Sequence, residues 1–370
     1  MKKYLLLTLL SWPTIASEIS TRIVNGTSVN SGDLSTNYPS FAGIGRTGFI
    51  GTYCGATVIR NEWILTAAHC FYREEAKMLS TVVYPRLVDE NDTLTATSHK
   101  AVAFYYPDDY VNSNSLLWPN DIAVIKLESS TGGDYTNLLN SSITNYSGRD
   151  YKAIGHGNTR YNVSGGTNLL ETTLDYAQTS ACKSQYGSAI TSNQLCFEGT
   201  ENVLSGLRNS TCGGDSGGPV YIDDSGTYVQ VGVTSFGPEI CGESSSSITS
   251  VFTNVHSYSD WISNVMAGFV TPKAYVTTRD GKRVLVNNDP APAVSEGGGD
   301  GGDDGGSVGI ASILLLFLHN LYRRATRCFR TQRILTSTDP LSVKIYLTSS
   351  LSTNFTDDKT VKKYLCYKLN

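Results

Sequence analysis

The chain has 370 residues, enough for one large domain or two smaller ones. Hydrophobic residues make up 40% of it and charged residues 17%, and its 35 Gly and 22 Tyr, with little helical periodicity, favour an all-β fold. The formal net charge of -4 excludes nucleic-acid binding that depends on bulk electrostatic attraction.

The N-terminus, residues 1–17, is predicted to be a signal peptide. Lys2 and Lys3 form a charged start, residues 4–10 form an apolar core, and Ser17 is a small residue suited to cleavage. Such a segment is too short to be a membrane anchor. We therefore expect export to an oxidising compartment, in which cysteines form disulfides.

Between residues 23 and 266, short apolar runs alternate with clusters of Gly, Asn, Ser and Asp. The runs have strand length and are rich in β-branched residues, and such a series indicates a β-sandwich or β-barrel. A terminal helix is predicted where apolar residues follow polar ones at helical spacing, over residues 258–266. The clearest strand candidates are residues 55–60, 63–68, 122–127, 229–236 and 251–255.

Residues 267–306 are predicted to be a linker that contains one hairpin. Within it, residues 274–288 indicate two strands around an Asp-Gly turn. A lone hairpin is not a stable domain, so this one either packs on the main domain or forms a stalk. The end of the linker, residues 296–307, is rich in Gly and Asp and is expected to be flexible.

A hydrophobic segment and a basic cluster follow the linker, over residues 307–330. The apolar run 308–318 is short for a bilayer span, and a buried helix is the alternative interpretation. Because nothing nearby in the sequence would cover it, we expect a short hydrophobic helix with transient or permanent membrane contact and its arginines in the cytoplasm. Residues 331–370 contain no motif.

Eight cysteines occur in the chain, and the first six lie in three close sequential pairs. Spacing alone does not determine how they connect. Zinc binding is the alternative to disulfides, but no C-x-x-C spacing supports it. The eight are Cys54, Cys70, Cys182, Cys196, Cys212, Cys241, Cys328 and Cys366.

Three short motifs contain candidate catalytic residues: 66-TAAHC-70 with His69, 120-NDIAVIKL-127 with Asp121, and 214-GDSGGP-219 with Ser216. A serine hydroxyl is a weak nucleophile until a histidine accepts its proton, and a carboxylate orients and stabilises that histidine. Glycines beside the serine let backbone N–H groups approach a developing oxyanion. Each motif alone is more often structural, but together they indicate a serine nucleophile.

With these motifs, and with 22-RIVNGT-27 and 54-CGATVI-59, the chain resembles the chymotrypsin-like (trypsin-like) serine peptidases from Ile23 to about Met266. The resemblance implies two six-stranded antiparallel β-barrels with the active site in the cleft between them. It implies a secreted serine endopeptidase that acts on proteins or peptides. An α/β-hydrolase esterase does not fit, because its G-x-S-x-G motif is absent and its histidine comes last.

The resemblance also implies a role for each catalytic residue. His69 is the general base and acid, Asp121 orients it, and Ser216 attacks the scissile carbonyl through an acyl-enzyme. The oxyanion hole consists of the N–H groups of Gly214 and Ser216. A catalytically dead binding protein of the same family is the second hypothesis.

Activation and disulfide pairing follow from the same resemblance. The zymogen would be cut between Arg22 and Ile23, which removes a propeptide of residues 18–22. The new Ile23 ammonium would then pair with the buried carboxylate of Asp215, because a buried charge needs such a partner. The implied disulfides are Cys54–Cys70, Cys182–Cys196 and Cys212–Cys241.

The substrate pocket implied by the resemblance has Ser210 at its base, six residues before the nucleophile. Ser210 supplies no anion to select Arg or Lys, Gly237 leaves the entrance open, and Ser250 makes the pocket shallower. We expect uncharged, apolar or aromatic residues before the scissile bond, and hence a separate protease to activate the chain at Arg22. The predicted pocket residues are Ser210, Thr211, Ser235, Phe236, Gly237 and Ser250.

The sequence leaves a second substrate preference open. A carboxylate from Glu239 or Glu243 would instead give selectivity for Arg and Lys.

His156, in 155-GHG-157 where the family often has Trp, is expected to be a surface or packing residue. No cofactor and no metal ion is predicted, since the acidic residues after His69 form no calcium-ligand pattern.

Residues 297–330 resemble the GlyGly-CTERM sorting signal of Gram-negative bacteria. That resemblance implies cleavage near residues 305–307 by a rhomboid-type protease and export through the periplasm by type II secretion, to the cell surface or the medium. Such signals end just after the basic cluster, so residues 331–370 depart from the pattern.

Overall fold

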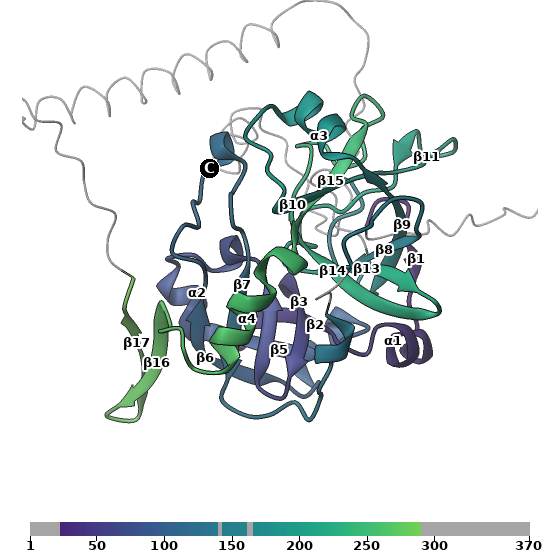
Figure 1. Ribbon diagram of the computed structural model, residues 1–370. Coiled ribbons are helices and arrows are strands. Elements are labelled where there is room, and N and C mark those ends of the chain that lie inside the picture. Colours follow the sequence, from purple (N-terminus) through teal and green to yellow (C-terminus); the bar gives the residue numbers. More distant parts are fainter. Residues whose placement is uncertain (1–22, 140–142, 161–165, 290–370) are drawn as a thin grey trace, which may run out of the picture. The chain divides into compact units, whose positions relative to one another are not determined.

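The computed structural model describes residues 23–139, 143–160 and 166–289 (Figure 1). The predicted signal peptide and propeptide, the Gly/Asp-rich stretch and the hydrophobic segment lie outside the described residues, as do Cys328 and Cys366. Within the described ranges, no helix is both long and apolar enough to cross a membrane.

The first of two antiparallel β-barrels contains six strands in the order β6-β5-β2-β3-β4-β7, and pairing of β6 with β7 closes it. Every pairing between neighbouring strands is antiparallel. The strands are β2 (Phe41–Arg46), β3 (Thr52–Arg60), β4 (Trp63–Thr66), β5 (Thr81–Pro85), β6 (His99–Tyr105) and β7 (Ala123–Leu127).

The second barrel has the order β9-β10-β15-β14-β13-β8, and pairing of β8 with β9 closes it. The short strand β1 (Thr27–Ser28) adds to β9, and β11 (Glu201–Asn202) with β12 (Leu207–Arg208) forms a separate hairpin. Two six-stranded barrels confirm the predicted fold. The strands are β8 (Tyr151–Gly155), β9 (Leu170–Ala177), β10 (Gln194–Glu198), β13 (Pro219–Asp224), β14 (Thr227–Phe236) and β15 (Ile248–Asn254).

In the described part of the chain, the helices are short and lie outside the barrels. The predicted terminal helix is α4, and its apolar residues Ile262 and Val265 are buried in the core of the first barrel. The 3-10 helix η1 contains His69 and directly follows β4 across Ala67, so the predicted strand over 63–68 is shorter than its apolar run. The helices are α1 (Ser31–Asn37), α2 (Glu75–Ser80), α3 (Thr179–Tyr186), α4 (Ser259–Met266), η1 (Ala68–Cys70), η2 (Glu90–Leu94), η3 (Asn114–Leu116), η4 (Thr136–Leu138) and η5 (Val255–Tyr258).

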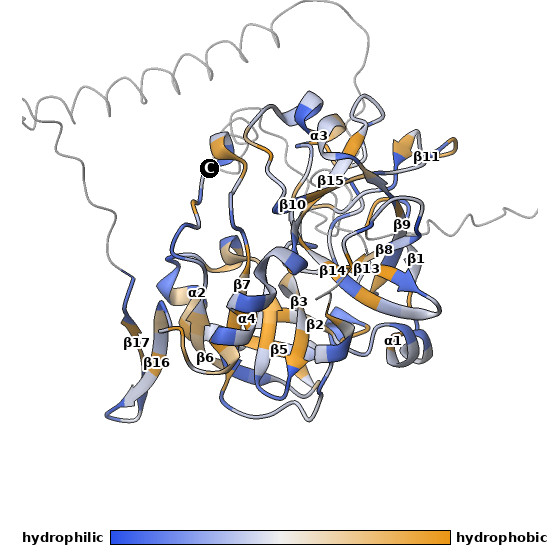
Figure 2. Cartoon of the chain, in the orientation of Figure 1, coloured by the Kyte–Doolittle hydropathy of each residue, from blue (hydrophilic) through white to orange (hydrophobic). Residues whose placement is uncertain are grey.

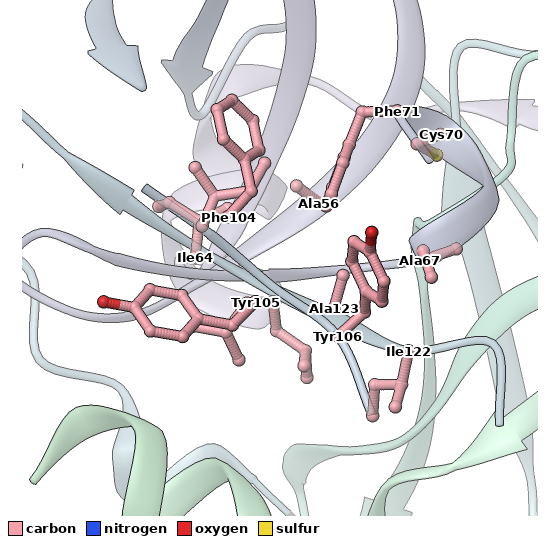
Figure 3. Close-up of a cluster of buried hydrophobic side chains, with 14 of the residues drawn as sticks. Ala56, Ile64, Ala67, Cys70, Phe71, Phe104, Tyr105, Tyr106, Ile122 and Ala123 are labelled. Carbon is pink, nitrogen blue, oxygen red and sulfur yellow. The ribbon is translucent and has the colours of Figure 1, made fainter. Parts of the chain in front are cut away.

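Each barrel encloses its own hydrophobic core, and Figure 2 shows apolar residues concentrated on the strands. In the first core, Phe71 is fully buried, its ring lies 4.9 Å from that of Phe104, and Ala56 and Ile64 belong to the same cluster (Figure 3). Phe71 lies two residues after His69, so packing of this core fixes the segment that follows the histidine.

The hairpin predicted over 274–288 is present as β16 (Ala274–Arg279) and β17 (Lys282–Asn287). Its turn residues Asp280 and Gly281 have φ values of 50° and 74°, as a two-residue hairpin turn requires. Strand β16 pairs with β6, and Ala274 is buried in the first core. Of the two open alternatives the structure shows packing on the main domain, so the compact unit extends beyond the predicted boundary at residue 266.

Replacement of Phe71 by Ala tests the packing of this core. Loss of a fully buried aromatic ring should lower the free energy of unfolding by about 3–5 kcal/mol. The measurement is urea denaturation of the Ser216→Ala protein with and without the second change. Phe49→Ala, at a side chain that is 62% exposed, is the control and should change stability by less than about 0.5 kcal/mol.

Candidate active site

The structure joins His69 and Asp121 by two hydrogen bonds. The backbone N–H of His69 donates to Asp121 Oδ1 at 3.0 Å, and His69 Nδ1 lies 2.7 Å from Asp121 Oδ2. The Ser235 hydroxyl donates to the same Oδ2 at 2.6 Å. Asp121 is fully buried, and these donors satisfy its carboxylate.

The contact from Ser235 was not expected, because the sequence predicts Ser235 only as a pocket residue. It lies on β14 in the second barrel, whereas Asp121 lies two residues before β7 in the first. Its bond to Asp121 therefore connects the barrels at the site. No sequence pattern signals this role.

The charge state of His69 is set by two opposing effects. Burial lowers the pKa of His69, but the charge of Asp121 and the hydrogen bond to it raise that pKa by more. The pKa of His69 therefore lies above its ordinary value. The same bond places the ring proton on Nδ1 in the neutral form, which leaves Nε2 as a base.

Ser216 lies next to the segment that contains His69. Its carbonyl oxygen accepts the Gly55 N–H at 2.8 Å and lies 3.7 Å from the sulfur of Cys70. Cys70 follows His69 directly and forms a disulfide with Cys54 on β3. The three candidate catalytic residues thus come together where the barrels meet.

Gly214 adopts a backbone conformation that favours glycine. Its φ is 104°, and a Cβ there would lie 2.9 Å from the Cα of Gly157. Among the described residues, the amide N–H groups of Gly214 and Ser216 donate to no protein acceptor. These two donors are available to stabilise a negatively charged oxygen.

The candidate activation residues Ile23 and Asp215 both contact Gly157. Asp215 is 1% exposed, and its carboxylate accepts the N–H groups of Gly157 at 2.7 Å and Cys212 at 2.9 Å. A Cβ on Gly157 would lie 2.4 Å from this carboxylate, so only glycine fits. The Ile23 nitrogen donates to the Gly157 carbonyl at 3.3 Å, whereas Arg22 lies outside the described residues.

A cavity of about 280 Å³ opens beside Ser216. Four predicted pocket residues line it, and Glu239 is the one acidic residue among its lining residues. Glu243 does not line it. The four predicted lining residues are Thr211, Ser235, Phe236 and Gly237.

The other two predicted pocket residues, Ser210 and Ser250, are fully buried and do not line this cavity. The Ser210 hydroxyl donates to the carbonyls of Thr211 at 2.6 Å and Thr249 at 2.9 Å. Ser250 Oγ accepts from the Thr211 N–H and lies 3.0 Å from the Thr211 hydroxyl. Both serines therefore support Thr211 from behind, and they add no charge to the cavity.

Two aromatic rings beside Phe236 were missed by sequence reasoning. Trp118 lies 5.6 Å and Tyr186 lies 5.4 Å from the Phe236 ring centroid. They come from a loop and from α3, far apart in the sequence. No spacing rule links them to the pocket.

The three implied disulfides, Cys54–Cys70, Cys182–Cys196 and Cys212–Cys241, are all formed. His69 lies close to both sulfurs of the first pair, but a disulfide sulfur is not a thiolate ligand, so this cluster does not fit a metal ion. His156 is 8% exposed and packs 5.7 Å from the Phe41 ring, which is the packing role.

Comparison with known proteins agrees with this arrangement. The sequence model described as Trypsin matches residues 23–262. CLIP domain-containing serine protease B4 of Anopheles gambiae is 32% identical over 238 residues, which are 59% of this chain and 62% of that protein. This chain thus spans less than two thirds of that relative.

Two mammalian relatives are covered more fully. Chymotrypsin-like elastase family member 1 of Canis lupus familiaris is 33% identical over 222 residues, 58% of this chain and 81% of that protein. The protein of the same name from Bos taurus is 31% identical over 261 residues, 68% of this chain and 91% of that protein.

Replacement of Asp121 by Asn should reverse the shift in the pKa of His69. The charge that raises this pKa disappears while burial remains, so the pKa should fall below its ordinary value of about 6.5. NMR titration of the His69 ring in the Ser216→Ala protein measures it. An unchanged pKa at His69 would contradict the assigned cause.

Proposed function

Because the chain belongs to the trypsin family of serine proteases, we propose that it is a secreted endopeptidase with a Ser216–His69–Asp121 triad, made as a zymogen. As a serine protease it acts on proteins or peptides. The observation that supports the triad best is the buried Asp121 carboxylate, bonded to His69 Nδ1 at 2.7 Å beside the segment that contains Ser216.

In the proposed mechanism, His69 Nε2 takes the proton of the Ser216 hydroxyl as Oγ attacks the scissile carbonyl. The imidazolium that forms is stabilised by the Asp121 carboxylate, which also accepts a hydrogen bond from the Ser235 hydroxyl. The N–H groups of Gly214 and Ser216 donate to the oxyanion. His69 then gives the proton to the leaving amine. Water next attacks the acyl-enzyme: His69 Nε2 takes a proton from the water and returns it to Ser216 Oγ as the product acid leaves.

Activation is proposed to follow cleavage between Arg22 and Ile23. The freed Ile23 ammonium would pair with Asp215, whose carboxylate is almost inaccessible to water. A buried carboxylate is strongly stabilised by such a cation. Asp215 immediately precedes Ser216, so the pair would order the oxyanion donors.

The pocket supports a preference for uncharged side chains. Ser210 and Ser250 are neutral, and their hydroxyls are already used in bonds to Thr211 and its neighbours. Likeness to elastase-named relatives points the same way. An enzyme of this preference cuts poorly after Arg22, so a separate activating protease is proposed.

A preference for Arg and Lys is the second candidate, and Glu239 is the observation that favours it. Glu239 lines the cavity beside Ser216, but it is exposed, and an exposed carboxylate attracts a substrate cation weakly in water. A non-catalytic binding role is the third candidate and would require the triad to be inactive.

Export and sorting remain proposals that rest on residues outside the described ranges. We propose a signal peptide over residues 1–17 and a sorting tail over 307–330, released by a rhomboid-type protease after type II secretion in a Gram-negative bacterium. A permanent short anchor at 308–318 is the alternative. Mass spectrometry of the mature C-terminus distinguishes the two.

Labelling with a fluorophosphonate probe tests the nucleophile. The protein cut at Arg22 should be labelled at Ser216 and should cleave peptides, and Ser216→Ala should abolish labelling and lower kcat on the order of 10⁶-fold. Ser235→Ala should instead retain labelling at a reduced rate. A folded, cut protein that takes no label would favour the non-catalytic role.

Cleavage of a peptide library tests the specificity. The activated enzyme should cut mainly after uncharged residues, because Glu239, the one acidic residue that lines the cavity, is exposed to water. Glu239→Gln should leave this order unchanged, and Glu243→Gln, outside the cavity, is the matched control. Dominant cutting after Arg or Lys that Glu239→Gln weakens would establish the second candidate.

Replacement of Arg22 by Gln tests the activation site. Treatment of the wild-type chain with trypsin should give an N-terminus at Ile23 and a large rise in activity. The Arg22→Gln chain should keep its N-terminal extension and stay inactive under the same treatment. Full activity of uncut Arg22→Gln protein would contradict zymogen control.

A further inference from the structure

The hairpin β11–β12 is a small addition to the second barrel (Figure 1), and within the described ranges neither of its strands pairs with any other strand. Hydrogen bonds attach its base to the barrel. The Arg208 N–H donates to the Gly242 carbonyl, in the loop between β14 and β15, at 2.7 Å, and Asn209 Nδ2 donates to the Thr173 carbonyl on β9 at 3.0 Å. The hairpin therefore holds Ser205, in its turn, and Leu207, on β12, at fixed positions.

Ser205 and Leu207 bind Asn25, which lies two positions after Ile23. The Ser205 hydroxyl donates to Asn25 Oδ1 at 2.7 Å, and Asn25 Nδ2 donates to the Leu207 carbonyl at 2.9 Å. Asn25 Nδ2 also lies 3.3 Å from Asn209 Oδ1. One side chain thus uses both its oxygen and its nitrogen to hold the hairpin.

The backbone at Asn25 fits this use. Its φ is 57°, in the left-handed region that Asn tolerates better than most residues. The preceding residue, Val24, pairs with Ser210: its N–H donates to the Ser210 carbonyl at 3.0 Å. The hairpin and Ser210 therefore hold consecutive residues of the N-terminal segment.

We propose that Asn25 and the hairpin β11–β12 form a latch that holds the N-terminal segment inserted after activation, and so set the fraction of active enzyme. The inference rests on the proposed activation at Arg22–Ile23. Asn25 acts as a positioning residue: it touches neither substrate nor reacting atoms, and it acts through the Ile23–Asp215 pair.

The alkaline limit of activity measures how strongly the latch holds the N-terminal segment inserted. A free α-amino group has a pKa of about 7.7–8.0, and only its protonated form pairs with Asp215. Insertion raises that pKa, and the rise grows with the insertion equilibrium constant. Weaker insertion therefore moves the alkaline midpoint of activity to lower pH, whereas the acid limb, set by His69, does not move.

The test compares pH profiles of kcat/KM for the activated full chain and its variants. Asn25→Gly keeps the positive φ and removes the amide, and Ser205→Ala removes the donor to Asn25 Oδ1. Loss of one or two hydrogen bonds should lower the insertion constant about 3- to 10-fold, which lowers the alkaline midpoint by about 0.5–1 pH unit. The control is Val203→Ser with Leu204→Ser at the hairpin tip, where both side chains are more than 90% exposed, and it should not move the midpoint.

The double variant separates the latch from local effects. Ser205 also accepts the Leu207 N–H within the hairpin, and glycine loosens the segment before insertion. If Ser205 acts through Asn25, Ser205→Ala should add little shift in the Asn25→Gly background. In each variant, the rate of carbamylation of the Ile23 amine by cyanate at pH 8 should rise by the factor by which that variant lowers the insertion constant.

An alkaline midpoint unchanged in both single variants, or equal and additive shifts in the double variant, would overturn the latch. If Asn25→Gly does not fold, Ser205→Ala decides alone. Wild-type enzyme with no alkaline limit, or with no gain of activity on cleavage at Arg22, would overturn the proposed activation instead, so the two failures are distinguishable.

Discussion

The buried carboxylate of Asp121 is the constraint on which the site depends. A fully buried charge is tolerated only where donors surround it, and here the donors come from two barrels. The first barrel supplies the backbone N–H and ring of His69, and β14 of the second supplies the Ser235 hydroxyl. Docking of the barrels is therefore coupled to the orientation of the histidine. A misplaced second barrel would leave Asp121 short of one donor and His69 less well held.

A second buried carboxylate, Asp215, is arranged differently. Its carboxylate accepts the backbone N–H groups of Gly157 and Cys212, and the space for it exists because Gly155 and Gly157 lack side chains. Amide donors stabilise a carboxylate, but an ammonium ion adds a full charge where water is excluded. In the proposed Ile23–Asp215 pair, the ammonium ion thus enters a site in which Gly155 and Gly157 already leave room for the carboxylate. The hydrogen bonds of Asn25 hold the segment that leads to this site.

The sequence predicts much of this arrangement because the motifs are local. TAAHC, NDIAVIKL and GDSGGP identify His69, Asp121 and Ser216 within a few residues each, and the alternating runs indicate the strands. The contacts that tune the site are not local. Ser235 reaching Asp121, Trp118 and Tyr186 flanking Phe236, and Ser205 reaching Asn25 each join residues from separate loops. Such pairs depend on how the barrels and loops pack, and a single sequence contains no spacing that encodes them.

The C-terminal hairpin shows why a boundary is also hard to set from sequence. Residues 274–288 have strand patterning but too few apolar residues for a core of their own, so a linker and an added sheet edge look alike. Packing decides between them: Ala274 enters the first core, and Asp289, just after β17, pairs with Arg73 at 2.8 Å and accepts from Tyr106. Arg73 lies four residues after His69, in the segment that Phe71 anchors. The hairpin therefore belongs to the same packed unit as the segment that contains His69, and it extends the constraint on that segment beyond the family's matched residues 23–262.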